Sequence, residues 1–473
     1  MARHERWVML TTLVLLQVVT IVTGVYLVSD DANLSALTRQ SSPTEPAASP
    51  STPPSAPVVT AGPVLAGLPA RSGGGPLPTK GTLTQQLTVA LGDKALGNRV
   101  GAIVVDAATG ERIFAANADT GITPASTTKV ITSAAALASL GPDARLATRV
   151  VQGASPGAVV LVGGGDPTLA GPSARSGAYP KPASLAILAS RTATALKAEG
   201  VTKVTLSYDA SLYTGPGVCP CWKPNYVPDG EVAPVSALAM DEGRRYPGQP
   251  APRVSDPPRY AAAAFARLLG RQGIGVTGSA RPAKAPAGAA ELARVESAPV
   301  YALVERTLTH SHDDLAEALA RQVALKEGRP ASFDGAATAV QQVVKRLGVA
   351  DGVLVRDGSG LSPHNRITPA ALARILAVAS SPAHPALHAV APGMPVAGFS
   401  GSLGNGRRFV GPDSKGQVGL VRAKTGTLNH VSTLAGLATT KDGRLVTFAF
   451  MADRVPVYAE PALDRLAAIV ARS

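Results

Sequence analysis

Aromatic residues are scarce in this chain: Phe, Trp and Tyr make up 4% of its 473 residues, and charged residues make up 16%. With so few aromatic side chains, the hydrophobic cores must be built from Ala, Val and Leu. Hydrophobic residues nevertheless reach 45%, which excludes disorder throughout the chain. At about 150 residues per domain, this length predicts roughly three folded units.

Cysteine is rarer still, and the two cysteines stand together as Cys219-Pro220-Cys221. Two cysteines exclude a disulfide-rich scaffold. Their spacing matches neither a CxxC redox motif nor the four ligands of a structural zinc site. The sequence leaves open whether the two thiols are joined.

Acidic residues are outnumbered, with 32 Asp and Glu against 45 Lys and Arg and a formal net charge of +13. The basic residues form no block with interleaved aromatic residues, so the sequence excludes nucleic acid as the expected partner. An anionic cell envelope is the better candidate for a surface of this charge.

Long apolar runs without charge or proline are absent apart from one, which extends from Trp7 to Val28. As a helix rising about 1.5 Å per residue it would measure about 33 Å, enough to cross a hydrocarbon core of about 30 Å. Basic residues precede the run and Asp30 and Asp31 follow it, which predicts that the bulk of the chain lies outside the cytoplasm. We therefore expect a single-pass protein of the cell membrane with a cytoplasmic tail over residues 1–6 and an uncleaved signal-anchor over 7–28. A cleaved signal peptide is the alternative.

Hydrophobic periodicity is missing from residues 29–82, which are rich in Pro, Ser and Gly and predict an extended linker. Helical spacing follows over 83–96, then two strands over 100–106 and 111–116. Residues 144–297 have a different pattern, with short β-like segments, many turns and little long helix. This pattern predicts an insertion. Beyond residue 301 helices return, and strands are expected over 420–424, 431–437 and 445–451 before a last helix over 461–471.

Two apparent active-site motifs fail on chemical grounds. Residues 153–157 read Gly-Ala-Ser-Pro-Gly and match the G-x-S-x-G pattern of a nucleophile elbow. Pro156 has no backbone N–H to offer an oxyanion, so a turn between strands is the better interpretation of Ser155. His384 and His388 have the spacing of zinc ligands but lack the glutamate of H-E-x-x-H, which favours surface or packing roles.

Ser126 and Lys129 lie three residues apart at the start of an apolar stretch over 130–140. On a helix this spacing places both side chains on one face, where a neutral lysine amine could take the serine proton. A serine at a helix start is also typical of an N-cap, which is the simpler alternative for the pair alone. The chain has no other S-x-x-K, and its one K-T-G, at Lys424-Thr425-Gly426, follows an apolar run far downstream.

S-x-x-K followed by K-T-G is the pattern of penicillin-binding proteins and β-lactamases. Further stretches make residues 83–470 resemble the D-alanyl-D-alanine carboxypeptidase/endopeptidase family of class C, low-molecular-mass penicillin-binding proteins. The long interval between Ser126 and Ser311 favours that family, since β-lactamases keep these motifs closer together. The stretches are GGGDPTL at 163–169, VAPVSAL at 232–238, Leu315-Ala316-Glu317 and DGSGLS at 357–362.

The resemblance implies an α+β, penicillin-binding/β-lactamase-like transpeptidase fold, in which helices pack on a five-stranded antiparallel sheet. The catalytic domain would comprise residues 83–143 and 298–473, interrupted by a β-rich insertion over 144–297. Ser126 would attack the carbonyl between two D-alanines, with Lys129 as the base. The backbone N–H groups of Ser126 and Thr427 would form the oxyanion hole. Lys424 would be a catalytic residue and Thr425, Gly426 and Thr427 substrate-binding residues, with no metal or other cofactor required.

The motif between S-x-x-K and K-T-G departs from the family pattern. Aligned on Leu315-Ala316-Glu317, the family's S-x-N falls on Ser311-His312-Asp313, so an aspartate replaces the asparagine. An ionised aspartate cannot donate a hydrogen bond to the substrate amide, and its charge would weaken Lys129 as a base. The family also often carries a basic residue directly after DGSGLS, where this chain has Pro363.

The sequence therefore predicts a membrane-tethered serine D-Ala-D-Ala carboxypeptidase, with endopeptidase activity as a further expectation. Its catalytic residues would be Ser126, Lys129, Ser311, Asp313 and Lys424. Its partners would be peptidoglycan stem peptides and, as covalent inhibitors, β-lactams. The alternative is a catalytically weak or silent muropeptide- or penicillin-binding protein on the same fold.

Overall fold

The computed structural model describes residues 80–473 except 173–176, 247–251, 350, 405 and 457. The predicted cytoplasmic tail, signal-anchor and most of the linker lie outside the described residues. Within them, no helix is both long and apolar enough to span a bilayer.

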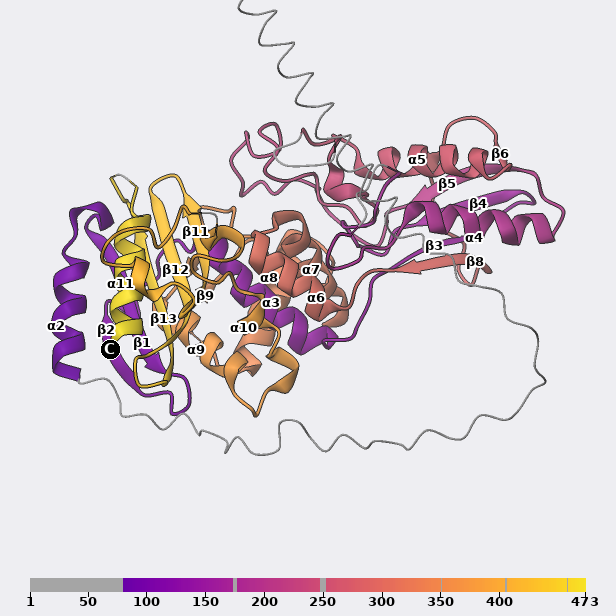
Figure 1. Cartoon of the computed structure of the whole chain (residues 1–473). Coiled ribbons are helices and arrows are strands. Elements are labelled where there is room, and N and C mark those ends of the chain that lie inside the picture. The colour runs from indigo at the N-terminus through magenta and orange to yellow at the C-terminus, as the bar shows by residue number, and fades with distance from the viewer. Residues whose placement is uncertain (1–79, 173–176, 247–251, 350, 405, 457) are drawn as a thin grey trace, which may run out of the picture. The chain divides into compact units, whose positions relative to one another are not determined.

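The first layer is a five-stranded sheet with the order β11-β12-β13-β1-β2, in which every neighbouring pair is antiparallel. Its central strands β12 and β13 are buried along nearly their whole length, as expected for strands covered on both faces. The carboxyl-terminal strands thus lie beside the amino-terminal pair (Figure 1). The bounds are β1 (Arg99–Asp106), β2 (Arg112–Ala116), β11 (Val421–Leu428), β12 (Val431–Thr439) and β13 (Leu445–Asp453).

Helices cover both faces of this sheet (Figure 1). On one face, α2 and α11 share an apolar core with alternate residues of the strands. On the other face, α9 contacts β1 and β13, and α3 packs against α6, α7, α8 and α9. The bounds are α2 (Lys80–Leu91), α3 (Thr128–Leu140), α6 (Val300–His310), α7 (Asp313–Lys326), α8 (Phe333–Arg346), α9 (Pro369–Ser380) and α11 (Glu460–Arg472).

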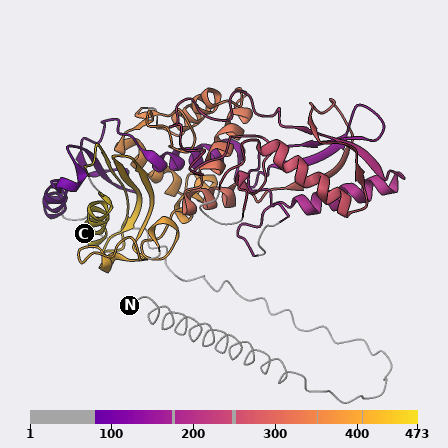
Figure 2. The same cartoon turned by 90° about the horizontal axis from the view of Figure 1, so that it is seen from above.

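A second, six-stranded sheet has the order β6-β5-β4-β3-β8, with β7 also paired to β5. Helices α4 and α5 pack against it and against each other through one apolar core (Figure 2). The bounds are β3 (Ala147–Gln152), β4 (Ala158–Val162), α4 (Leu185–Ala198), β5 (Lys203–Asp209), α5 (Pro257–Arg271), β6 (Gly275–Val276), β7 (Arg281–Pro282) and β8 (Glu291–Glu296).

The expectation of little long helix in residues 144–297 is wrong, because α4 and α5 have 14 and 15 residues. Both helices are rich in Ala, which blurs the contrast between apolar and polar positions. Their start signals are nevertheless clear. Ser184 and Asp256 accept backbone N–H groups of the first turns, from Ile187 and Arg259 respectively.

Short elements complete the chain. The residues of the rejected G-x-S-x-G motif form the turn between β3 and β4, where Gly153 N donates to Ala158 O and Ala158 N donates to Ser155 O. The remaining helix and strands are β9 (Val353–Leu354), β10 (Arg366–Ile367) and α10 (Val390–Gly393), with single 3-10 turns at Lys94–Leu96, Ala125–Thr127, Asp241–Gly243, Pro385–Leu387, Gly401–Leu403 and Lys415–Gln417.

The long segment between β5 and α5 packs against α7, α8 and the loop at Asp357. A disulfide joins Cys219 to Cys221, which resolves what the sequence left open. The Trp222 indole N–H donates to Asp357 Oδ2 at 2.8 Å, and its ring stacks edge-on against Phe333 with centroids 5.2 Å apart. This segment therefore forms part of the wall around the candidate site described next.

Candidate active site

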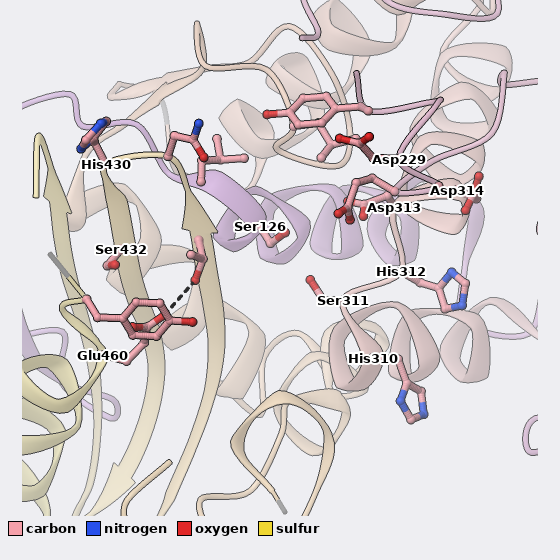
Figure 3. A pocket seen from close by; sticks show the side chains of 18 of the residues that line it. Ser126, Asp229, His310, Ser311, His312, Asp313, Asp314, His430, Ser432 and Glu460 are labelled. Atoms are coloured by element: carbon pink, nitrogen blue, oxygen red, sulfur yellow. Dashed lines mark hydrogen bonds between the residues drawn. The ribbon is translucent and has the colours of Figure 1, made fainter. Parts of the chain in front are cut away.

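A cavity of about 870 Å³ lies where α3, the α6–α7 junction, the end of β11 and the segment before α5 meet (Figure 3). Of the residues predicted from the sequence, Ser126, Ser311, Asp313 and Thr427 line it. Lys129 lies beneath the wall and is fully buried. Lys424, Thr425 and Gly426 are not among the lining residues.

Ser126 lies in the 3-10 turn that leads directly into α3. Its Oγ accepts a hydrogen bond from Lys129 Nζ at 2.9 Å, so the S-x-x-K pair meets as the helical spacing predicts. No side chain caps α3, which removes the N-cap explanation for Ser126. The preceding residue, Ala125, has φ +50°, a conformation that non-glycine residues rarely adopt. Gly360 makes the turn possible, because a Cβ there would lie 2.0 Å from Ala125 O.

The Lys129 amine has three oxygen partners. Besides Ser126, it donates to Asp313 Oδ1 at 2.7 Å and to Ser359 O at 2.6 Å. An ammonium group has three donors, so these partners use its full capacity. To act as a base, the amine must release one of these contacts and turn its lone pair toward the Ser126 hydroxyl.

The short connection between two helices brings residues 311–313 to the cavity. Helix α6 ends at His310, Ser311 adopts a left-handed conformation with φ 55°, and α7 begins at Asp313. Ser311, His312 and Asp313 consequently all line the cavity. Most of the His312 side chain is buried, and its Nε2 lies 3.0 Å from a Glu242 carboxylate oxygen. The aspartate predicted to depart from the family pattern is thus the ion-pair partner of Lys129.

The K-T-G motif lies on β11, the edge strand beside the cavity. Lys424 is fully buried, and its Nζ donates to Thr425 O at 2.8 Å. Burial, followed by the nearby charge of Lys129, lowers the pKa of Lys424 well below its ordinary value. Gly426 lets the strand approach the nucleophile turn, because a Cβ there would lie 2.6 Å from Pro124 O. Thr427, the residue directly after this motif, lines the cavity.

In the sequence, Glu317 and the DGSGLS stretch served only as markers of the family. In the structure they are hydrogen-bonded to each other. Glu317 is fully buried, and its Oε1 accepts the N–H groups of Gly358 and Ser359 at 3.0 and 2.8 Å. Thr132 Oγ1 donates to Gly358 O from the other side at 2.7 Å. These bonds hold the loop with the Ser359 carbonyl directed at Lys129. Burial, with the Asp357 charge as second cause, raises the pKa of Glu317 to about 8.

Glu317→Gln should make the free energy of unfolding depend less on pH. Between about pH 4.5 and 8 the folded protein keeps the Glu317 proton that the unfolded chain has lost, so stability falls as pH rises through this window. A glutamine keeps the acceptor oxygen but cannot ionise. Thermal unfolding from pH 5 to 8 should show a smaller decrease for the variant than for the wild type. Equal decreases would show that Glu317 is not a buried neutral acid.

The segment before α5 contributes the remaining wall of the cavity. Tyr226, Asp229 and Glu231 line it. The segment is attached to α7 through Asp314, which accepts Ala233 N at 2.8 Å and pairs with Arg253 at 3.0 Å. Burial raises the pKa of Asp314 to about 6, although the Arg253 charge opposes the shift. No local sequence pattern indicates this contact, because its partners come from distant parts of the chain.

One protein family and two curated relatives match most of this chain. A model of the D-Ala-D-Ala carboxypeptidase 3 (S13) family matches residues 83–249 and 246–472. A carboxypeptidase of Mycobacterium tuberculosis is 37% identical over 427 residues, which cover 88% of each chain. The carboxypeptidase DacB of Mycolicibacterium smegmatis is 36% identical over 400 residues, covering 84% of this chain and 85% of the relative.

Among solved structures, penicillin binding protein 4 of Haemophilus influenzae matches with a TM-score of 0.66 and 23% identity. The match covers 83% of this chain and 98% of that protein. At this identity the likeness shows the fold alone. It confirms the penicillin-binding/β-lactamase-like fold class expected from the sequence.

Proposed function

This chain belongs to the D-Ala-D-Ala carboxypeptidase 3 (S13) family, and we propose that it is a serine-type D-Ala-D-Ala carboxypeptidase acting on peptidoglycan stem peptides. One observation carries the proposal. Ser126 Oγ, Lys129 Nζ and Asp313 Oδ1 form a continuous hydrogen-bonded chain, and Ser126 and Asp313 line the cavity beside the edge strand. Nucleophile, base and substrate-binding edge are thus close together.

Catalysis would proceed through an acyl-enzyme. With Lys129 neutral, its amine takes the Ser126 proton while Oγ attacks the carbonyl carbon between the two D-alanines. The negative charge on the carbonyl oxygen is stabilised by the N–H groups of Ser126 and Thr427. Breakage of the C–N bond releases the terminal D-alanine, whose amine receives the proton from Lys129. Water then hydrolyses the ester on Ser126.

A strained β-lactam amide would acylate the same hydroxyl, which makes penicillin a probe of the site. The experiment combines fluorescent penicillin labelling with measurement of D-alanine released from a peptide ending in D-Ala-D-Ala. Labelling together with release supports the peptidase. Labelling without release supports the second candidate, a penicillin-binding protein without peptidase activity, which the aspartate at position 313 favours. The absence of both would overturn the assignment.

Asp313→Asn should raise the acylation rate by about tenfold at neutral pH. The carboxylate offsets the Lys129 charge and supplies no donor to the substrate amide, whereas an asparagine removes the charge and adds a donor. A tenfold gain corresponds to about 1.4 kcal/mol of barrier. Stopped-flow acylation by a chromogenic cephalosporin measures it.

Asp442→Asn, in the exposed turn between β12 and β13, removes the same charge and serves as the control. Its rate should equal that of the wild type. If Asp313→Asn is slower than the wild type at every pH, Asp313 is itself required for acylation, and the view of a weakened enzyme is wrong.

The location of the protein is a separate proposal. The uncharged run from Trp7 to Val28 supports a retained signal-anchor with the catalytic domain outside the cell membrane. A mature protein that keeps its original amino-terminal segment and fractionates with membranes is the expected result. A soluble product that begins beyond about residue 28 would identify a cleaved signal peptide instead.

A further inference from the structure

The disulfide bond of this chain lies in the segment that forms part of the wall around the candidate active site. It joins Cys219 to Cys221, and the chain has no other cysteine. Cys219 is buried, whereas Cys221 is half-buried and the neighbouring Val218 and Pro220 are exposed. A reagent in the solvent therefore reaches this bond from the side of Cys221.

The disulfide is joined directly to a buried apolar cluster. Trp222 N donates to Cys219 O at 3.0 Å, which closes a turn over the bonded pair. The Trp222 ring and the Cys219 side chain both belong to the cluster. Its other members are Tyr226, Val232, Phe333 and Leu361. The conformation of residues 219–221 thus sets the position from which the Trp222 ring enters the cluster.

Trp222 connects this turn to the loop over residues 357–362. Its indole N–H donates to Asp357 Oδ2 at 2.8 Å. Asp357 is buried and organises the loop, because its carboxylate also accepts the N–H groups of Gly360 and Ser362 at 3.0 and 2.7 Å. Asn365 Nδ2 donates to the same carboxylate at 2.7 Å. Loss of the indole N–H would leave a buried carboxylate short of one donor, which favours a rearrangement of the loop.

The same loop contacts both parts of the catalytic pair. Ser359 O accepts a hydrogen bond from Lys129 Nζ at 2.6 Å. Gly360 lies against the nucleophile turn, since a Cβ there would lie 2.0 Å from Ala125 O. A shift of the loop therefore moves a partner of Lys129 and the support of the turn that carries Ser126.

A disulfide between residues two apart restrains the local conformation of the chain. Disulfides stabilise a fold mainly by restricting the unfolded chain, and the effect grows with the number of residues that the bond encloses. This bond has a sequence separation of 2. Its reduction therefore frees residues 219–221 while the rest of the protein stays folded.

We propose that the disulfide between Cys219 and Cys221 is a redox modification site, at which reduction by a dithiol releases the Trp222 indole from Asp357 and lowers the activity of the Ser126 site. This inference rests on the proposed function, because the activity that the disulfide controls is the release of D-alanine. The oxidised protein is the more active form.

The reduction is a thiol–disulfide exchange. A thiolate of the dithiol attacks Cys221 Sγ, the S–S bond breaks, and Cys219 Sγ leaves with the electron pair and takes up a proton. The second thiol of the reductant then attacks the mixed disulfide and releases the Cys221 thiol. The dithiol ends as a disulfide, and the protein gains two electrons and two protons. Oxidation reverses these steps and uses a disulfide of the same class.

The test compares the full chain before and after treatment with dithiothreitol. Mass measurement after alkylation with iodoacetamide should show two modified thiols in the treated protein and none in the untreated protein. Reduction should lower kcat/KM for release of D-alanine from a peptide ending in D-Ala-D-Ala by about tenfold, equivalent to about 1.4 kcal/mol of barrier. Mass spectrometry of the shortened peptide measures the release, and oxidation of the protein should restore the rate.

Tryptophan fluorescence reports the release of Trp222 directly. The chain has one other tryptophan, Trp7, so the additional substitution Trp7→Phe leaves Trp222 as the only tryptophan. Because the Trp222 ring is buried, its emission should shift to longer wavelength when reduction exposes the ring to water. Far-UV circular dichroism should stay unchanged, which separates a local release from unfolding.

Two variants test the connection between the disulfide and the loop. Cys219→Ser combined with Cys221→Ser should have the rate of the reduced protein and should not respond to dithiothreitol, which also controls for other effects of the reagent. Trp222→Phe keeps an aromatic ring next to Phe333 but lacks the indole N–H. Its rate should be lowered in the oxidised protein, and reduction should lower it little further. Tyr301→Phe, at an exposed position of α6, removes a ring donor elsewhere and should respond as the wild type does.

Several outcomes would overturn the proposal. They are a disulfide that dithiothreitol does not reduce in the folded protein, a reduction that leaves the rate unchanged, and an equal fall of the rate in Trp222→Phe and in the wild type. If the protein releases no D-alanine in either redox state, the peptidase assignment is wrong. The redox site is then judged by the rate of labelling with fluorescent penicillin, which should show the same fall after reduction.

Discussion

Replacing Ser126 with alanine should abolish both the covalent β-lactam adduct and the release of D-alanine. Ser126 lines the cavity, and its hydroxyl oxygen accepts a hydrogen bond from Lys129 Nζ. Without this oxygen no acyl-enzyme forms, and loss of the nucleophile in such a unit lowers the rate by on the order of 10⁴ to 10⁶. Intact-mass measurement after exposure to penicillin should show one adduct on the wild type and none on the variant.

The control for this experiment is Ser155→Ala, which alters the serine of the rejected G-x-S-x-G motif. Ser155 lies in the turn between β3 and β4 and is not among the residues that line the cavity. The adduct should form on this variant at the wild-type rate. An adduct that persists in Ser126→Ala, or that maps to Ser155, would disprove the assignment of the nucleophile.

Replacing Lys129 should slow acylation by about 10² to 10⁴, the usual contribution of general-base assistance. Lys129→Met is preferable to Lys129→Ala, because the side chain is fully buried and methionine fills most of its volume. The variant keeps the Ser126 hydroxyl but lacks the amine that lies 2.9 Å from it, so removal of the hydroxyl proton is unassisted. Rapid-mixing acylation by a chromogenic β-lactam measures both rates.

A thermal unfolding scan shows whether the variant is folded, since Asp313 loses its ion-pair partner. Lys326→Ala, at the exposed end of α7, serves as the control and should acylate at the wild-type rate. A folded Lys129→Met protein that acylates as fast as the wild type would show that another group removes the Ser126 proton.

Some of this site could be predicted because it depends on local geometry. Ser126 and Lys129 are three residues apart on one helical turn, so their side chains meet whatever the rest of the fold does. The strands β11, β12 and β13 were also predictable, since short apolar runs separated by turns are typical of buried antiparallel strands. Helices α4 and α5 were not predicted, because their alanine-rich sequences blur the helical pattern.

The sequence by itself determined the S-x-x-K pair, the edge strand with K-T-G and the family, because each depends on residues close together in the chain. Only the tertiary structure decided that Asp313 and the Ser359 carbonyl complete the contacts of Lys129 and that Lys424 is buried away from the cavity. It also decided that Trp222, next to the disulfide, is hydrogen-bonded to the loop that supplies this carbonyl. Such contacts arise when distant segments pack to bury their apolar faces, and the spacing of residues along the chain carries no record of which polar groups that packing brings together.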